Sequence, residues 1–447
     1  MKRTALRMGV VVVAAAVAAG WWSQGYASAD SSAAPTDQQK IDQLNQEINQ
    51  LKQQKAQLEA QLKAAKPTPA PTPAPPLTTP SVTGPLTMNS PTTVDLSGVA
   101  GPMLSGLPES IQNLEKFDLN GVASGIGIVQ DHAEPGDRSS RADASNAQII
   151  LQQPNGLIQY YLQVGAYSIP DLGLPYTSSG NSVNKLWGPL PVGFLKIQPT
   201  DSLSIQGGNL PTLIGAEYTF TFQNMNIERG LLWNQEPAIS RGVQVNYSQG
   251  PLSGAISWNN GFYSKSYTWL TGELTYAFNS ANSLEAVGGG NLGFSKFSNF
   301  ATPAAQNNSE IFNLIYTYNS APWIFQPYFQ WTLVPHNSDI GVGKNTYTLG
   351  GAILASYQVS EHFFIAGRGE FIGQNGNATD GAANLLYGPG SQAYSLTLTP
   401  TYQYKQFFAR PEVSYVQALS YTSGDVFGNK FENPAQVRGA LEFGVLL

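Results

Sequence analysis

Three arginine–glutamate pairs near the carboxyl end have the spacing that places opposite charges on one face of a β-strand. They are Arg368 with Glu370, Arg410 with Glu412, and Arg438 with Glu442. Because side chains two or four residues apart on a strand point to the same side, each pair presents an acid and a base together. On nearly adjacent strands, such pairs predict a mixed-charge wall whose transverse field orients polar solutes and repels apolar ones. The alternative, in which the charges neutralise one another and select nothing, stays open.

A second group of charges lies in the long stretch 209–239, between two expected strands. It contains Glu217, Glu228, Arg229 and Glu236. We expect this stretch to lie opposite the arginine-rich wall and to form a constriction with it. Lys196 is a more distant candidate for the same wall.

The charged pairs lie on segments in which apolar and polar residues alternate strictly. Between positions 394 and 404 the even residues are apolar or aromatic, and the odd ones are Ser, Thr or Gln. The segments 406–415 and 437–447 repeat the pattern, with Arg and Glu on the polar side. This regularity, together with aromatic residues near strand ends such as Trp323 and Tyr357, is typical of a transmembrane barrel. We therefore predict an all-β protein built around an antiparallel transmembrane β-barrel.

Sixteen strands are predicted, although fourteen or eighteen would also fit the pattern. They cover roughly 121–131, 144–152, 157–167, 190–198, 201–208, 240–248, 252–259, 266–278, 283–292, 309–319, 322–333, 345–358, 361–373, 392–404, 406–419 and 435–447. Short turns alternate with longer loops, which is the outer-membrane arrangement. An even number of strands places both ends of the barrel domain, 121–447, on the periplasmic side.

The chain begins with a predicted signal peptide, 1–29. Lys2, Arg3 and Arg7 precede an apolar core, and small residues precede Asp30. Its removal changes the net charge from −6 to about −9, since three positive charges are lost and no negative ones. This acidity argues against nucleic acid as a partner. The predicted location is the bacterial outer membrane, with lipid as the surrounding partner.

Three further segments separate the signal peptide from the barrel. A heptad pattern over 36–65 predicts a coiled coil, with Ile41, Ile48, Lys55 and Leu62 at a and Leu44, Leu51, Leu58 and Ala65 at d. A Pro/Thr/Ala-rich spacer follows at 66–80, in extended polyproline geometry. The segment 81–120 is poorly patterned and contains one helix candidate, 108–117. Whether this segment plugs the barrel or lies beneath it stays open.

The sequence offers little for catalysis or for cofactors. The histidines, His132, His336 and His362, fall in expected loops or turns. His132 lies near Asp131, Glu134 and Asp137, an acidic run that is more typical of solvated surface, or of a loose cation site, than of a catalytic centre. We find no glycine-rich phosphate loop and no metal-ligand spacing, so we predict no enzyme activity, no cofactor and no metal site.

Two stretches resemble the putative beta-barrel porin-2 family of outer-membrane proteins. One begins at Gly207-Gly208-Asn209-Leu210-Pro211 and continues through Asn224 to Arg229 and Arg241-Gly242-Val243; the other is Phe408-Ala409-Arg410-Pro411-Glu412. The likeness covers roughly 120–447 and implies an outer-membrane pore. In general porins the third loop folds into the barrel, which implies the same for 209–239. The amino-terminal coiled coil is similar to that of trimeric dicarboxylate-type porins and implies a homo-oligomer, with a trimer favoured.

Two functions agree with these observations. The first is a porin that allows passive diffusion of small hydrophilic solutes or ions through a water-filled barrel. The second is a structural outer-membrane anchor that tethers the envelope through residues 36–80, with peptidoglycan or periplasmic proteins as partners. The sequence specifies neither the solute nor the ion selectivity.

Overall fold

The computed structural model describes residues 46, 49, 52, 53, 85–88, 90–104, 106, 113–134, 136–377 and 379–447. The predicted signal peptide and the spacer lie outside the described residues. So does the predicted coiled coil, except for 46, 49, 52 and 53, which are helical. The chain divides into two units, Met1–Pro73 and Ala74–Leu447, and the barrel belongs to the second.

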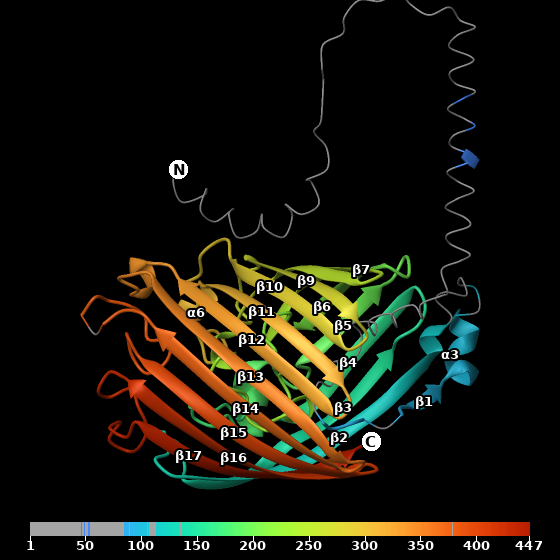
Figure 1. Ribbon diagram of the computed structural model, residues 1–447. Helices are drawn as coiled ribbons and strands as arrows, with labels where there is room; N and C mark the ends of the chain where they lie inside the picture. Colours follow the sequence, from blue (N-terminus) through green and yellow to red (C-terminus); the bar gives the residue numbers. More distant parts are fainter. Residues whose placement is uncertain are drawn as a thin grey trace, which may run out of the picture. The chain divides into compact units, whose positions relative to one another are not determined.

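Within the described residues, sixteen antiparallel strands, β2 to β17, close into a barrel (Figure 1). Each strand pairs with its neighbours in the sequence, and the barrel closes where β17 pairs with β2. A further short strand, β1, pairs with the beginning of β2. The predicted all-β transmembrane barrel and its sixteen strands are therefore confirmed. Closure leaves no strand edge unpaired, as a membrane-spanning sheet requires.

The strands have the following bounds: β1 Thr92–Asp95, β2 Lys116–Gln130, β3 Ser140–Gln153, β4 Ile158–Tyr167, β5 Val192–Ile197, β6 Leu203–Pro211, β7 Ile239–Gln249, β8 Leu252–Asn259, β9 Trp269–Asn279, β10 Asn282–Asn291, β11 Glu310–Ser320, β12 Trp323–Val334, β13 Thr346–Ser360, β14 Phe363–Gln374, β15 Gln392–Tyr404, β16 Phe407–Ser420 and β17 Ala435–Leu446. The helices are short: α3 Ser97–Leu104, η1 Asn113–Glu115, α5 Ser179–Asn181, η2 Ser182–Leu186, η3 Thr221–Gln223, η4 Trp233–Gln235, α6 Ala304–Asn307 and η5 Ser338–Ile340. Among the described residues, no helix has both the length and the apolar character needed to cross a membrane.

The connections differ between the two ends of the barrel. At one end, which we call the turn end, the strands are joined by tight turns such as 250–251 and 405–406. At the other, the loop end, the connections are long, as at 168–191 and 212–238. This is the predicted alternation of short turns and long loops.

The beginning of the barrel differs from the prediction. β2 begins at Lys116 and not at 121, because its first residues pair with β1, where Lys116 forms an ion pair with Asp95 at 3.4 Å. The predicted helix 108–117 is wrong at its end, since 116 and 117 belong to β2. Its residues 108–112 lie outside the described part of the chain.

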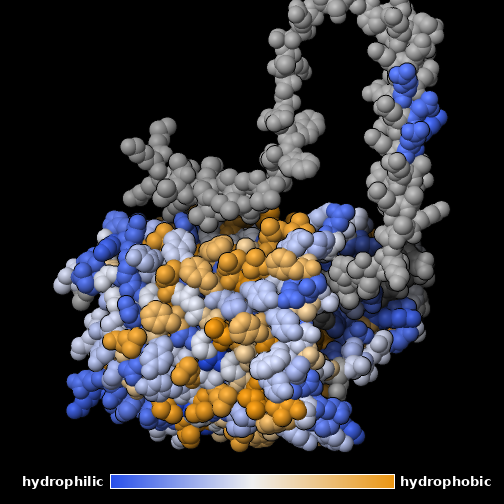
Figure 2. Space-filling model, viewed as in Figure 1, coloured by the Kyte–Doolittle hydropathy of each residue, from blue (hydrophilic) through white to orange (hydrophobic). Residues whose placement is uncertain are grey.

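The two faces of the wall differ as strand alternation requires. On β16, Val413 is 51% exposed and faces outward, whereas Arg410 is fully buried and faces inward. Apolar and aromatic side chains follow the outward positions of other strands, and Figure 2 shows hydrophobic patches among paler residues on the visible wall. These side chains suit the hydrocarbon region of a bilayer, with aromatic residues near its borders.

A short part of the segment 81–120 enters the turn end. Leu86 is buried in one cluster with Val122 and Phe408, whose side chains face inward. The Thr87 backbone exchanges two hydrogen bonds with the side chain of Gln403, at 2.8 and 2.7 Å. Residues 85–88 therefore lie against the inner wall at this end, which the sequence left open.

Candidate functional site

The segment 212–238 connects β6 and β7 and is almost entirely buried, although only η3 and η4 give it regular structure. It begins three residues later than the predicted stretch 209–239, because Asn209, Leu210 and Pro211 still pair with β7. A buried irregular backbone needs hydrogen-bond partners outside itself. In this barrel, the partners come from the charged wall.

Two wall glutamates accept hydrogen bonds from the main chain of this loop. Glu412 on β16 accepts from the N–H groups of Ile227 at 2.6 Å and Glu228 at 3.0 Å. Glu370 on β14 accepts from those of Leu231 at 3.1 Å and Leu232 at 3.3 Å. The two carboxylates thus satisfy four backbone donors, and hydrogen bonds to a charged acceptor are stronger than neutral ones.

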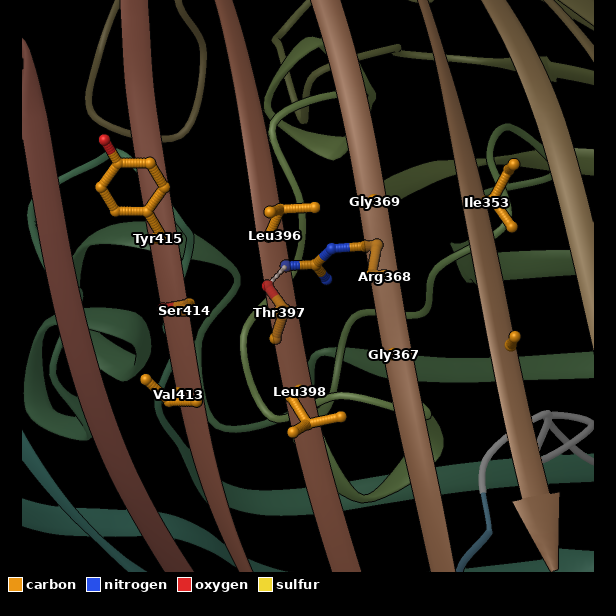
Figure 3. Close-up of a pocket in the computed structure, with 11 residues that line it drawn as sticks. Ile353, Gly367, Arg368, Gly369, Leu396, Thr397, Leu398, Val413, Ser414 and Tyr415 are labelled. Carbon is orange, nitrogen blue, oxygen red and sulfur yellow. Dashed lines mark hydrogen bonds between the residues drawn. The ribbon is translucent and has the colours of Figure 1, made fainter.

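Two wall arginines bind the carbonyl groups of the same loop. Arg410 donates to Thr221 O at 2.6 Å and to Asn224 O at 3.0 Å. Arg368 on β14 donates to Glu228 O at 2.6 Å. Figure 3 shows Arg368 also reaching Thr397 on the neighbouring strand β15, at 3.3 Å. The wall therefore binds both N–H and C=O groups of the loop main chain between 221 and 232.

Ion pairs neutralise Arg368, Glu370 and Arg410. Arg410 pairs with Glu442 at 2.6 Å, and Arg368 pairs with Glu217 at 2.6 Å and Glu370 at 3.2 Å. Thr221 donates a further hydrogen bond to Glu442 at 2.7 Å. Neutralisation matters because an unpaired charge in such surroundings is strongly destabilising.

Arg438 on β17 joins three connections at the loop end. It pairs with Glu228 at 2.5 Å and with Glu134 at 3.2 Å, and it donates to Asp171 O at 3.0 Å. One buried guanidinium therefore links the connections after β2, β4 and β6. Its planar group with several donors suits this multiple contact.

Two glycines permit the close approach of the loop to carboxylates. At Gly230 a Cβ atom would overlap the carboxylate of Glu370, and at Gly215 it would overlap that of Glu236. Gly215 also has a φ of +88°, in the left-handed region that favours glycine. Both positions therefore require glycine for the loop to lie as it does.

Arg229 and Glu236, the last two predicted site residues, also lie in the segment 212–238. Arg229 is fully buried and pairs with Asp171 at 3.2 Å. Burial raises the pKa of Asp171 to about 6, against the lowering effect of Arg229. Glu236 is buried and, among the described residues, neither carboxylate oxygen has a hydrogen-bond partner. Burial, followed by repulsion from Glu217 and Glu370, raises the pKa of Glu236 well above its ordinary value.

All ten predicted residues thus lie on one side of the barrel interior, nine of them in one network and Glu236 beside it. The wall was expected to act directly on solutes, but Arg410, Glu412 and Arg438 are buried beneath residues of the loop-end connections. Their role in selecting solutes stays a prediction. Two partners were missed. Glu134 was interpreted as solvated surface but is buried against Arg438, and Asp171 lies in a loop whose sequence gave no charge pattern.

The opposite part of the inner wall has few charges. Its inward positions on β6 to β9 carry mostly amides and hydroxyls, such as Gln206, Gln244 and Ser257. Glu273 on β9 and Glu285 on β10 are partly exposed and, within the described residues, have no ion pair. Alternation along each strand places both side chains inward. Neither was predicted as a site residue, because each is the single charged residue of its strand. Lys196 on β5 faces the same interior.

A family model described as putative beta-barrel porin-2, OmpL-like, matches residues 116–447. No curated protein matches the chain. Among solved structures, an anion-selective porin from Comamonas acidovorans is 12% identical with a TM-score of 0.51, covering 74% of this chain and 99% of that one. In-vitro folded OmpT, an outer membrane protein of Vibrio cholerae, is 12% identical with a TM-score of 0.49, covering 74% and 97%. The outer membrane channel DcaP of Acinetobacter baumannii is 11% identical with a TM-score of 0.48, covering 74% and 97%. At this identity, the likeness to the Comamonas porin indicates a shared fold.

Proposed function

Since this chain belongs to the putative beta-barrel porin-2, OmpL-like family, we propose that it allows passive diffusion of small hydrophilic solutes or ions across the outer membrane. The observation that carries the proposal is the attachment of segment 212–238 to one side of the inner wall. The loop would narrow the barrel, and we place the proposed solute path beside the amides and hydroxyls at inward positions of β6 to β9. A path lined by amides and hydroxyls suits hydrated solutes.

Single-channel recording tests this function. The full-length protein, reconstituted in a planar bilayer, is expected to give stepwise ionic conductances. A protein that folds and inserts in the bilayer but never conducts would refute the proposal. The variant lacking 36–80 separates it from the alternative, an envelope anchor: a pore conducts without this segment, whereas an anchor loses its envelope phenotype.

We further infer a homo-oligomer, with a trimer favoured, from the uneven distribution of aromatic residues on the outer wall. The exposed aromatic side chains of the described residues lie beyond β6, for example Trp258, Phe278 and Tyr402; none lies in β2 to β6. Several outward positions of β2 and β3 carry small residues instead, among them Ala123 and Ala147, beside aliphatic Val129 and Ile149. Aromatic belts mark contact with the lipid interface. Their absence supports contact of this part of the wall with a second copy.

A matched pair of variants tests the inferred contact. Ala147→Trp on β3 is expected to shift the protein from oligomer to monomer, because a large ring prevents close approach. Ala355→Trp, on an outward position of β13, serves as the control and is expected to leave the oligomer intact. Light scattering in detergent measures both. Equal behaviour of the two variants would contradict the assignment of the contact to β2 and β3.

The amino-terminal segments complete the proposal. A signal peptide at 1–29 would direct export, and the coiled coil 36–65 with its spacer 66–80 would extend into the periplasm. There it would strengthen the oligomer and contact peptidoglycan or periplasmic proteins. Limited proteolysis of intact cells and of isolated envelopes tests this topology, since 36–80 is expected to be cleaved only after the outer membrane is opened.

A further inference from the structure

A cavity of about 690 Å³ lies among the connections of the loop end. Five aromatic residues from four connections line it: Tyr176, Trp187, Trp233, Phe262 and Phe300. Its volume lies in the range of ligand sites, which are concave, largely apolar and equipped with a few polar groups. The cavity therefore has the general character of a binding site for a small solute.

Several of these rings are held in place. Trp187 stacks on Tyr167 with ring centroids 6.1 Å apart, and the Tyr167 hydroxyl donates to Gly188 O at 3.0 Å. Phe262 packs edge-on against Trp269 at 5.7 Å. Rings fixed before a ligand arrives lose little conformational freedom on binding. The cavity is thus largely preformed.

The polar groups of the lining leave both donors and acceptors without partners among the described residues. The donors are Trp233 Nε1 and Arg141 Nε, and the acceptors are Asn234 Oδ1 and the two carboxylate oxygens of Glu236. Buried polar atoms in folded proteins are almost always hydrogen-bonded, so these unpartnered atoms require an explanation. Trp233 and Glu236 are each more than nine-tenths buried.

The unpartnered atoms belong to a rigid part of the lining. The side-chain amide of Asn234 donates to Leu172 O at 3.0 Å, and its main-chain carbonyl accepts from Gln306 at 2.8 Å. The side-chain oxygen, Oδ1, has no partner among the described residues. η4 carries Trp233, with Asn234 and Gln235, and Glu236 follows directly. The guanidinium of Arg229 lies 5.3 Å from the ring of Trp233 and supports it. Fixed positions make these atoms effective binding groups and not merely mobile surface.

The mixture of groups selects the class of ligand. A simple anion would find donors but also the carboxylates of Asp137 and Asp171, and a simple cation would find acceptors but also Arg138 and Arg141. Hydroxyl groups both donate and accept, and the apolar faces of a saturated ring pack on aromatic side chains. We propose that this cavity binds a neutral polyhydroxylated ring, such as a small carbohydrate. The proposal rests on the porin function, for which the cavity would be the entrance to the solute path.

Binding can be measured without ion conduction. Calorimetric titration of the full-length protein in detergent with maltose is expected to give a saturable heat, with the dissociation constant raised at least severalfold by Trp233→Phe, which retains a ring and removes Nε1. Trp323→Phe changes a tryptophan of the outer belt on β12 and is the control, expected to bind maltose as the unmodified protein does. The heat-modifiable mobility of the barrel on gels verifies that each variant is folded.

The same titration with sodium benzoate and choline chloride tests the ligand class. We expect neither to compete with maltose. Absence of saturable maltose binding by the folded protein would overturn the inference, as would equal effects of the two tryptophan variants, or tighter binding of benzoate or choline. These outcomes are distinct from failure of the porin proposal, which is judged by conductance alone.

Discussion

The two sides of the barrel interior use charge in different ways. The side formed by β14, β16 and β17 carries Arg368, Arg410 and Arg438 with their carboxylate partners, all buried beneath the loop. The side formed by β5 to β10 carries few charges, and Glu273 and Glu285 remain partly exposed. A charge that is paired and covered produces little field in the lumen, whereas an exposed unpaired charge acts directly on passing ions. The denser charge pattern therefore holds the loop, and we propose that the sparser one faces the solute.

Removing an arginine that binds the loop to the wall is expected to have the largest effect on stability and conductance. Arg410→Ala leaves Glu442 buried without its partner and removes the two hydrogen bonds to Thr221 and Asn224. Loss of one member of a buried pair costs about 3–5 kcal/mol. We expect a lower unfolding free energy and a larger, noisier single-channel conductance, because the loop is released from the wall. Urea unfolding and bilayer recording measure these changes.

Arg241→Ala provides the control for this variant. Arg241 lies on β7 with an exposed side chain whose guanidinium donates to the Tyr263 hydroxyl. Its removal is expected to change stability and conductance little. If Arg410→Ala behaves like this control, the wall does not hold the loop.

The pH dependence of stability tests the link between the anchored loop and the connection after β4. The pKa of Asp171 is about 6 in the folded state, above its ordinary value of 3.8, so folding favours its protonation. The stabilisation is complete below about pH 4 and is lost as the pH rises through 6, a change of about 3 kcal/mol. The unfolding free energy of the unmodified protein is therefore expected to fall, relative to Asp171→Asn, between pH 4 and pH 7.5.

The comparison with Asp171→Asn cancels other titrating groups, since both proteins contain them. Urea titrations of the detergent-folded barrel at several pH values provide the measurement. A constant difference between the two proteins over this range would show that Asp171 is not held in the described surroundings.

The exposed carboxylates of the other side are expected to control ion preference. Replacing Glu273 and Glu285 together by Gln removes two carboxyl groups from the proposed solute path and should shift the reversal potential in a salt gradient toward anions. Neutralising Glu361, in the turn between β13 and β14, is the control. A larger shift from Arg368→Gln than from the double glutamate variant would reverse the assignment of the two sides.

The alternation of residues was sufficient to predict the barrel, because parity along a strand depends only on local geometry. The same parity placed Arg368, Arg410 and Arg438 inward correctly. It did not reveal that a loop covers them, since this depends on contacts between residues far apart in the chain, such as Arg410 with Thr221. Asp171 and Glu134 were missed for the same reason. Glu273 and Glu285 were missed because a single charge on a strand forms no pattern.

The wall carboxylates and arginines contact the main chain of the loop at residues such as Ile227, Leu231 and Leu232, and not their side chains. Every amino acid except proline offers the same N–H group. At these three positions other apolar residues that fill the same space can therefore replace the present ones while the loop keeps its course, whereas Thr221, Glu228 and Arg229 bind Glu442, Arg438 and Asp171 through their side chains. Glycine would remain necessary at 230. The same wall can therefore bind loops that differ in apolar side chains. Related barrels could change their loop sequence in this way while the wall residues stay the same.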